Sequence, residues 1–274
     1  MYLNEQNAER IGSRMYGSFS LRKSYLLLIA LAIIFSGLSL WSIYKNEWFS
    51  AYLSNIASGI IGSLIIIFLI DQIIARNREN ERLRVVRIAL KRLRLPILWH
   101  MTLLCKIYKA SAQTKPTPLP TTFEDTFKDN YYREIAFLDF TKKAPVVPEI
   151  DWFNYLYLEM KSFKEKIEQV VDAYASFLDV TLIDMLEKIA NSSFLLIIPQ
   201  FRMVREVDRK EGFKRVYTML SGMEKIVKEH VSLMLALIKY FNSKSDSPIQ
   251  FNYGVWRDDE APQWGSGRIL SQSL

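Results

Sequence analysis

The sequence is poor in the residues that build disulfides and metal centres. It holds one cysteine, Cys105, and two histidines, His100 and His230, among 274 residues. A single cysteine excludes an intrachain disulfide and is typical of proteins in a reducing compartment. Two histidines so far apart in sequence argue against a zinc site. Because all three side chains lie among apolar residues at helical spacing, we expect interior or interface positions for them.

Catalytic motifs are also missing from the sequence. It contains no phosphate-binding Gly-rich loop followed by lysine, no paired-glycine dinucleotide turn, no Gly-x-Ser-x-Gly turn and no zinc-protease helix motif. The acids at 258–260 are most simply a solvated loop, and the glycines at 265 and 267 follow no strand signal. The sequence therefore points neither to an enzyme nor to a cofactor or a small-molecule substrate.

Charge is missing from a long stretch near the N-terminus. Residues 24–44 carry no charged side chain, and about twenty helical residues cross a hydrocarbon core of ~30 Å. This segment ends in Trp41 and Tyr44, which are typical of a membrane interface and not of a signal-peptide cleavage site. A second apolar segment follows at 49–75. The sequence predicts two transmembrane helices.

The short link between these segments predicts a hairpin whose two ends lie on the same side of the membrane. Positive residues flank the outer ends of the hairpin, within the N-terminal segment 1–23 and after residue 75, whereas the link at 45–48 holds one lysine and one glutamate. We expect the chain to lie in a bacterial inner membrane, and the positive-inside rule places both of its termini on the cytoplasmic side.

The second segment carries two adjacent faces of small and polar residues spaced four apart. These are Ser54, Ser58 and Gly62 on one face, and Asn55, Gly59 and Ser63 on the other. Small residues let helices approach closely, and asparagine can hydrogen-bond between helices. One use is packing within the hairpin against Ala32, Ser36 and Gly37, which we favour for one face. The other is packing between subunits, around a water-filled path.

Asp71 belongs to the same apolar segment and is a further candidate site residue. It lies five residues before Arg76, close to the expected cytoplasmic interface. An acid near the hydrocarbon is costly and is often functional. We favour a plain interfacial acid over a pore or gating residue.

A basic helix is expected directly after the membrane segment, at 76–113. Residues 76–94 hold eight basic against two acidic side chains, so they carry +6 of the net charge of +7. The apolar seam consists of Leu83, Val86, Leu90, Leu93 and Ile97, and the basic stripe beside it consists of Arg84, Arg87, Lys91 and Arg94. The stripe has three interpretations. It could bind anionic lipid headgroups, bind nucleic acid, or be a solvated run that only fixes the orientation of the chain in the membrane. Nucleic acid is the least favoured. Pro96 is expected to kink or end this helix.

The remainder is expected to be a cytoplasmic helical bundle. Residues 114–149 form a Pro-rich linker or irregular region, in which 123–141 is either a short helix or a lid. Within the bundle at 150–241, helices are predicted from the N-cap Asp151 to about residue 177, from 180 to 198 before Pro199, and from 211 to 241. The tail at 242–274 is either a docking segment or a partly ordered end. The predicted fold class is all-α.

Two stretches carry a resemblance to known proteins. SNIASGIIGSLIIIFLIDQIIARNRENERLR (54–84) and LIDMLEKIANSSFLLIIPQ (182–200) resemble small bacterial proteins with a two-helix membrane hairpin and a cytoplasmic helical domain. In design the chain is similar to the two-transmembrane effector of a retron, an anti-phage system. The resemblance implies a membrane toxin that partners keep silent, namely a reverse transcriptase with its RNA–DNA hybrid, and that permeabilises the inner membrane on release.

The same features leave a second class of function open. A membrane-anchored scaffold or sensor would use the hairpin as an anchor and the helical domain to bind a protein or nucleic-acid partner. Both hypotheses expect contact with anionic lipids and a homo-oligomer or hetero-complex, because one hairpin cannot enclose a water path.

Overall fold

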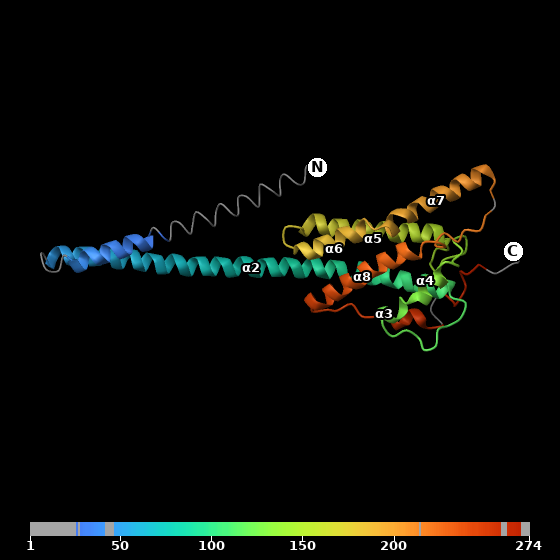
Figure 1. The fold of residues 1–274 in the computed structure, drawn as a ribbon, viewed down its shortest axis with the longest axis horizontal. Coiled ribbons are helices and arrows are strands. Elements are labelled where there is room, and N and C mark those ends of the chain that lie inside the picture. The colour runs from blue at the N-terminus through green and yellow to red at the C-terminus, as the bar shows by residue number, and fades with distance from the viewer. Residues whose placement is uncertain (1–25, 27, 42–46, 214, 259–261, 270–274) are drawn as a thin grey trace. The chain divides into compact units, whose positions relative to one another are not determined.

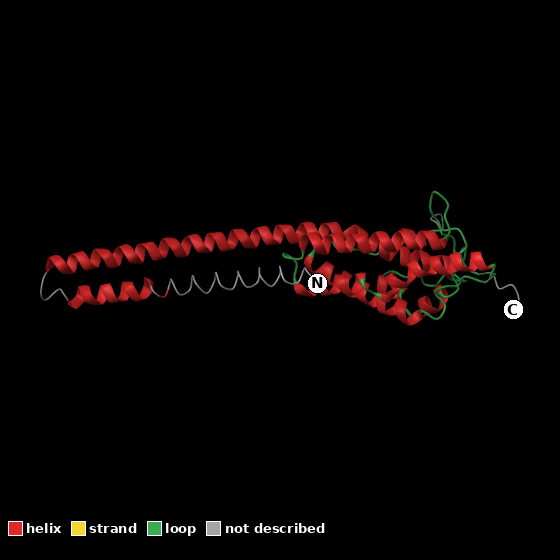
Figure 2. Cartoon of the chain, turned by 90° about the horizontal axis from the view of Figure 1, so that it is seen from above, coloured by secondary structure: helices red, strands yellow, loops and turns green. Residues whose placement is uncertain are grey.

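The computed structural model of the chain describes residues 26, 28–41, 47–213, 215–258 and 262–269. Over these residues the chain is helical, and no strand occurs (Figure 2). The all-α prediction is therefore confirmed. The chain divides into two compact units, Met1–Glu81 and Arg82–Leu274. The division falls inside one helix, α2, which runs from Glu47 to Ser111 (Figure 1).

In the first unit an apolar helix, Leu28–Trp41, packs against the start of α2. Ser39 and Ser50 join the two helices, because the Oγ of each donates to the carbonyl oxygen of the other at 3.1 Å. Ala32 of the first helix is buried, and so are two side chains of α2 near its start. These α2 residues are Leu53 and Ala57.

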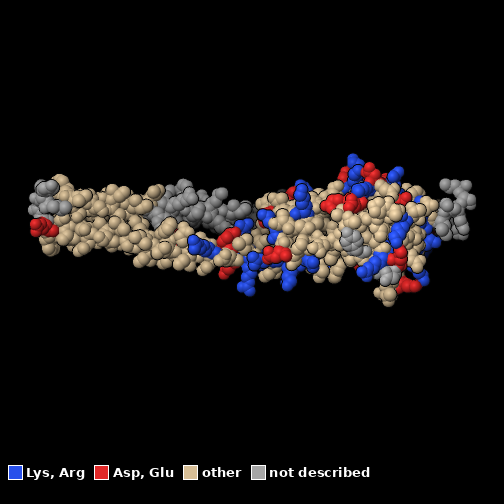
Figure 3. Space-filling view, turned by 90° about the horizontal axis from the view of Figure 1, so that it is seen from below, with Lys and Arg blue, Asp and Glu red and all other residues tan. Residues whose placement is uncertain are grey.

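Among the described residues, α2 is the one helix that is long and apolar enough to cross a membrane. Figure 3 shows few charged side chains over the apolar part of the chain on the face drawn. It contains the predicted segment 49–75. The first predicted segment, 24–44, is described mainly as the shorter helix Leu28–Trp41. Most of the rest of that segment, the N-terminal segment 1–23 and the first half of the link, 45–46, fall outside the described residues. The membrane hairpin and its orientation stay predictions.

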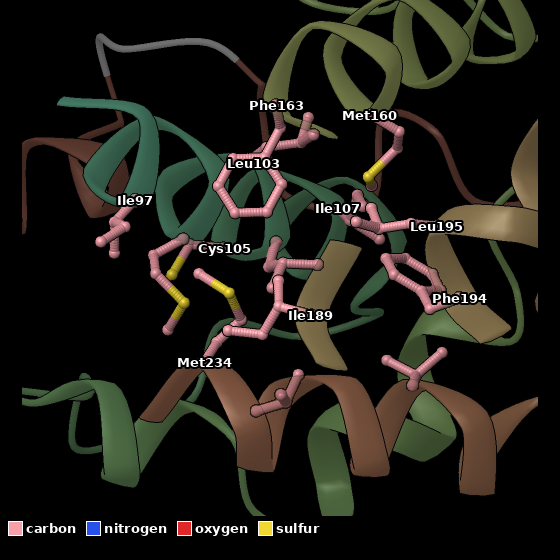
Figure 4. Packing of buried hydrophobic residues seen from close by; sticks show 14 of the residues in the cluster. Ile97, Leu103, Cys105, Ile107, Met160, Phe163, Ile189, Phe194, Leu195 and Met234 are labelled. Atoms are coloured by element: carbon pink, nitrogen blue, oxygen red, sulfur yellow. The ribbon is translucent and has the colours of Figure 1, made fainter. Parts of the chain in front are cut away.

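In the second unit the C-terminal half of α2 runs through the hydrophobic core. Its side chains from Leu93 to Tyr108 recur on one buried face, where they meet side chains of the surrounding helices (Figure 4). These helices are α5 (Trp152–Tyr174), α6 (Val180–Ala190), α7 (Ser193–Glu211) and α8 (Glu224–Lys244). Pro96 was expected to kink or end this helix, and an end there is wrong, because α2 and its buried face continue past that residue to Ser111, close to the predicted end at 113.

The expected helix ends are right at α5 and wrong at α7 and α8. Asp151 is the N-cap of α5, since its Oδ1 accepts from the backbone N–H of Asn154 at 2.9 Å. The predicted helix 180–198 is two helices that meet at Ser192, and Pro199 lies inside the second. The predicted helix 211–241 starts only at Glu224. Residue 211 instead belongs to the end of α7, where Gly212, at φ 73°, is the left-handed C-cap.

The Pro-rich region 114–149 is irregular at 114–122, and its later part joins the hydrophobic core. It forms α3 (Phe123–Thr126) and α4 (Asp129–Ile135), so the short-helix alternative is confirmed over the lid. Its aromatic residues are buried together against α2 and the tail. Those buried are Phe123, Phe127, Tyr131, Tyr132 and Phe140.

The described part of the C-terminal tail docks on the end of α2. The last carbonyls of a helix have no partner within the helix. Here the N–H of Gly265 donates to Lys109 O and the N–H of Gly267 donates to Ala110 O, both at 2.9 Å. The Arg268 guanidinium donates to Ser111 O, also at 2.9 Å. The tail also contains a short 3-10 helix, Tyr253–Trp256.

Gly267→Ala is expected to lower the stability of the second unit, Arg82–Leu274, here called the helical body. A Cβ there would lie 2.9 Å from Leu138 Cδ1, 3.0 Å from Trp152 Nε1 and 3.2 Å from Ala110 Cβ, so the tail must shift. We expect a loss of about 1–3 kcal/mol, measured by urea unfolding of the full chain in mild detergent. Ser266→Ala, at the exposed neighbouring position, is the control. Equal unfolding midpoints for the two variants would show that the tail is not held as described.

Candidate functional site

The polar face of α2 in the apolar segment is open within the chain. Asn55, Ser58, Gly59 and Ser63 are exposed, and Gly62 is half-buried. A Cβ added at Gly59, Gly62 or, on the other helix, Gly37 would meet nothing within 4 Å. The first helix packs on a different side of α2. Hairpin packing and packing between subunits both stay predictions for this face, and its exposure favours the second.

Asn55 is the residue of this face that most needs a partner. Its side-chain amide makes no hydrogen bond within the part of the chain that the structure describes, whereas Ser63 Oγ donates to Gly59 O at 2.9 Å. An amide left without hydrogen bonds in hydrocarbon costs several kcal/mol, on the order of 4–8. If α2 crosses a membrane, this position favours contact with another polar helix or with water.

Asp71 does not belong to the same face. It is half-buried and lies sixteen residues after Asn55. At 100° per residue this spacing places it about 160° around the helix from Asn55. The structure therefore does not bring Asp71 together with the polar face, and its role as an interfacial acid stays a prediction.

The four residues of the predicted basic stripe line a groove of about 610 Å³, here called the basic groove. Arg84, Arg87, Lys91 and Arg94 come from α2, and the groove surface between them is formed by apolar side chains of the same helix. The other wall is the loop that follows α8. The lining is completed by Ile88, Leu90, Leu95, Ser245, Asp246 and Ser247.

The basic groove carries an excess of positive charge. Four cations face one carboxylate, Asp246, whose Oδ2 lies 3.4 Å from Arg87 Nε. Both side chains of this ion pair are well exposed, at 73% and 82%, so the attraction between them is weak. The described part of the chain provides no ion pair for Arg84, Lys91 or Arg94. The Nε of Arg94 is buried without an acceptor.

The loop wall of the basic groove is fixed in position. The side chain of Asn242 accepts from the N–H of Ile249 at 2.7 Å and donates to its carbonyl at 3.1 Å, which closes the loop. Inside it, the N–H of Ser247 donates to Ser245 Oγ at 3.2 Å. Sequence reasoning identified this segment as a loop but not its place beside the stripe, because no local signal reports a contact some 160 residues away.

The two histidines lie in the interior, as expected, but they also contact each other. The Nε2 atoms of His100 and His230 are 2.7 Å apart, and His230 Nδ1 lies 2.8 Å from Ser192 Oγ. His100 stacks on Phe163 with ring centroids 3.9 Å apart. Burial lowers the pKa of His230 to about 3, and burial together with the neighbouring His230 lowers the pKa of His100. Both rings are therefore neutral at pH 7 and are poor general bases.

Metal and thiol chemistry find no support in the described residues. They contain no group of three or more His, Cys, Asp or Glu side chains that could hold a metal ion. Cys105 is buried, and this burial raises the pKa of its thiol. The two candidate sites that the structure describes are the polar face of α2 and the basic groove.

Comparison of the chain with protein-family models, with curated proteins and with solved structures finds no match. The resemblance to retron effectors therefore stays a prediction from the two sequence stretches that carry it. The function has to be argued from the polar face and the basic groove themselves.

Proposed function

We propose that the chain is an integral membrane effector whose subunits associate through the polar face of α2 and thereby permeabilise the membrane. The observation that supports this proposal is the exposure of Asn55, Ser58, Gly59 and Ser63 on a helix otherwise suited to hydrocarbon. Small residues allow a second helix to approach closely, and the Asn55 amide gains a hydrogen-bond partner there.

A homo-oligomer is part of this proposal. Each chain supplies at most two membrane helices, which cannot enclose water between them. Several copies arranged with their polar faces inward would place Asn55 and the serines along a shared path, while Ile61 and Phe68, which are exposed on the other side of α2, face lipid. Both termini are then cytoplasmic, and the helical body carried by α2 is available to partners that keep the effector silent.

The setting proposed for this activity is defence against phage. The resemblance implies a reverse transcriptase with its RNA–DNA hybrid as the silencing partner, and infection as the trigger. Without such partners the chain is expected to be active.

Induced expression of the full chain in bacteria tests this proposal. We expect loss of the membrane potential, read with a potential-sensitive dye, before growth stops. Normal potential and growth on strong induction, with the chain present in the membrane fraction, would contradict it.

The basic groove favours a second candidate, a membrane-anchored sensor that forms no pore. A weakly paired cluster of cations beside a fixed loop is a binding surface and requires no path through the bilayer. Replacing residues 1–75 by an unrelated membrane anchor separates the two candidates. A sensor would still bind its partner in this chimera, whereas an effector would no longer depolarise the membrane.

A further inference from the structure

We propose that the basic groove is a binding site for a phosphate ester. The inference rests on the placement of four cations of α2 and a fixed loop around an apolar floor. It does not depend on whether the membrane helices form a pore.

The first argument is the balance of charge. Arg84, Lys91 and Arg94 have no acidic partner among the described side chains, and the pair formed by Arg87 is exposed and weak. Cations held this close together repel one another, so an anion that bridges them is bound favourably. Guanidinium groups match the oxygens of phosphate in pairs of parallel hydrogen bonds.

The second argument is the position of Arg94. This side chain is half-buried, and its Nε atom is sealed from water without an acceptor. A buried donor that belongs to a charged group is costly to leave unpaired. The Arg94 side chain also lines the groove, so an anion bound there would offset this cost by attracting its guanidinium charge.

The third argument is the size and lining of the basic groove. A volume of about 610 Å³ suits a small molecule or a single lipid headgroup. Ile88 and Leu95 are 42% and 46% exposed and would cover the apolar part of an ester, whether an acyl chain or a ring. The ligand expected is therefore a phosphate joined to an apolar group, supplied either by a lipid or by a soluble molecule.

Asp246 is expected to compete with this ligand. Its carboxylate is the one acid in the lining, and it lies beside Arg87. A bound phosphate must displace it from the guanidinium and is repelled by its charge. Removing the carboxylate should therefore strengthen binding, which a merely structural role for the groove would not produce.

Binding to the purified full chain in uncharged detergent tests the proposal. One probe is a fluorescent phosphatidic acid carried in the micelles, followed by anisotropy, with the corresponding phosphatidylcholine as reference. The other is phenyl phosphate, a soluble phosphate ester with an apolar ring, followed by calorimetry. A short single-stranded oligonucleotide is included, because an extended nucleic acid would be a different class of ligand.

We expect Arg84→Gln with Lys91→Gln to weaken binding about tenfold or more at low salt, and Asp246→Asn to strengthen it severalfold. The control is Lys225→Gln with Lys239→Gln, which removes the same charge from exposed positions of α8 outside the groove. Circular dichroism checks the fold of each variant.

Groove-dependent binding of either phosphate probe supports the proposal, and the probe that binds identifies a lipid or a soluble source. The proposal is overturned if neither probe binds, if the two double variants bind alike, or if the oligonucleotide alone binds. None of these outcomes requires membrane permeabilisation, so failure of the effector function would be seen separately.

Discussion

Asn55→Leu is expected to reduce membrane depolarisation by the induced chain at least about tenfold, while the chain still enters the membrane. Leucine is more compatible with hydrocarbon than asparagine, so insertion is not impaired. The variant removes an interhelical hydrogen bond of on the order of 1 kcal/mol. This loss is repeated in every subunit of an oligomer, so the assembled form is destabilised several times over. Dye-reported potential and the amount of chain in the membrane fraction are measured together.

Ile61→Leu is the matched control for this experiment, because Ile61 is an exposed apolar residue less than two turns further along α2. It is expected to depolarise cells like the unmodified chain. Gly59→Leu should behave like Asn55→Leu, since it fills open space on the same face that a second helix would need. Full depolarisation by both polar-face variants would show that this face has no part in the activity.

Lowering the pH from 7 to 5 is expected to destabilise the helical body by at least about 2 kcal/mol. The folded-state pKa of His230, about 3, lies below its unfolded value near 6.5, so the unfolded chain takes up the proton first. The stability is therefore complete above about pH 6.5 and falls by about 1.4 kcal/mol per pH unit toward pH 3. His100, whose pKa is also lowered by burial, adds to the loss in the same direction.

Urea unfolding of the full chain in detergent at pH 7.5 and pH 5 measures this effect. His230→Gln keeps a polar group near Ser192 and His100 but removes one titration. This variant is expected to be less stable at pH 7.5, because the site is tightly packed, and to lose less stability between the two pH values. An unchanged pH dependence in His230→Gln would contradict the assignment of acid sensitivity to the pair.

Periodicity and capping predicted much of the helical body. The apolar seam of α5 and its cap at Asp151 are local features, and the structure has both. Proline did not predict where helices end, because α2 continues through Pro96 and α7 through Pro199. At both positions buried side chains follow the proline on the same helical face, and this packing outweighs the lost hydrogen bond.

Contacts between distant segments could not be predicted. The tail on the end of α2, the histidine pair and the loop beside the basic stripe each join residues more than 100 positions apart. The stripe itself follows from spacing, because residues three and four apart share a face. Near the start of α2, Leu53 and Ala57 are buried and the small polar residues are not. The nearby hydrogen bonds between Ser39 and Ser50 leave no pattern in the sequence from which this could be predicted.

Cysteine labelling of the two ends of the membrane segment tests the central claim most directly. Glu47→Cys and Lys239→Cys place a thiol at exposed positions in the link and in the helical body, while Cys105 is buried and stays unreactive. In intact spheroplasts an impermeant maleimide is expected to label Glu47→Cys at once and Lys239→Cys after permeabilisation. The opposite pattern, or recovery of the chain from the soluble fraction without detergent, would contradict a membrane hairpin that carries a cytoplasmic helical body.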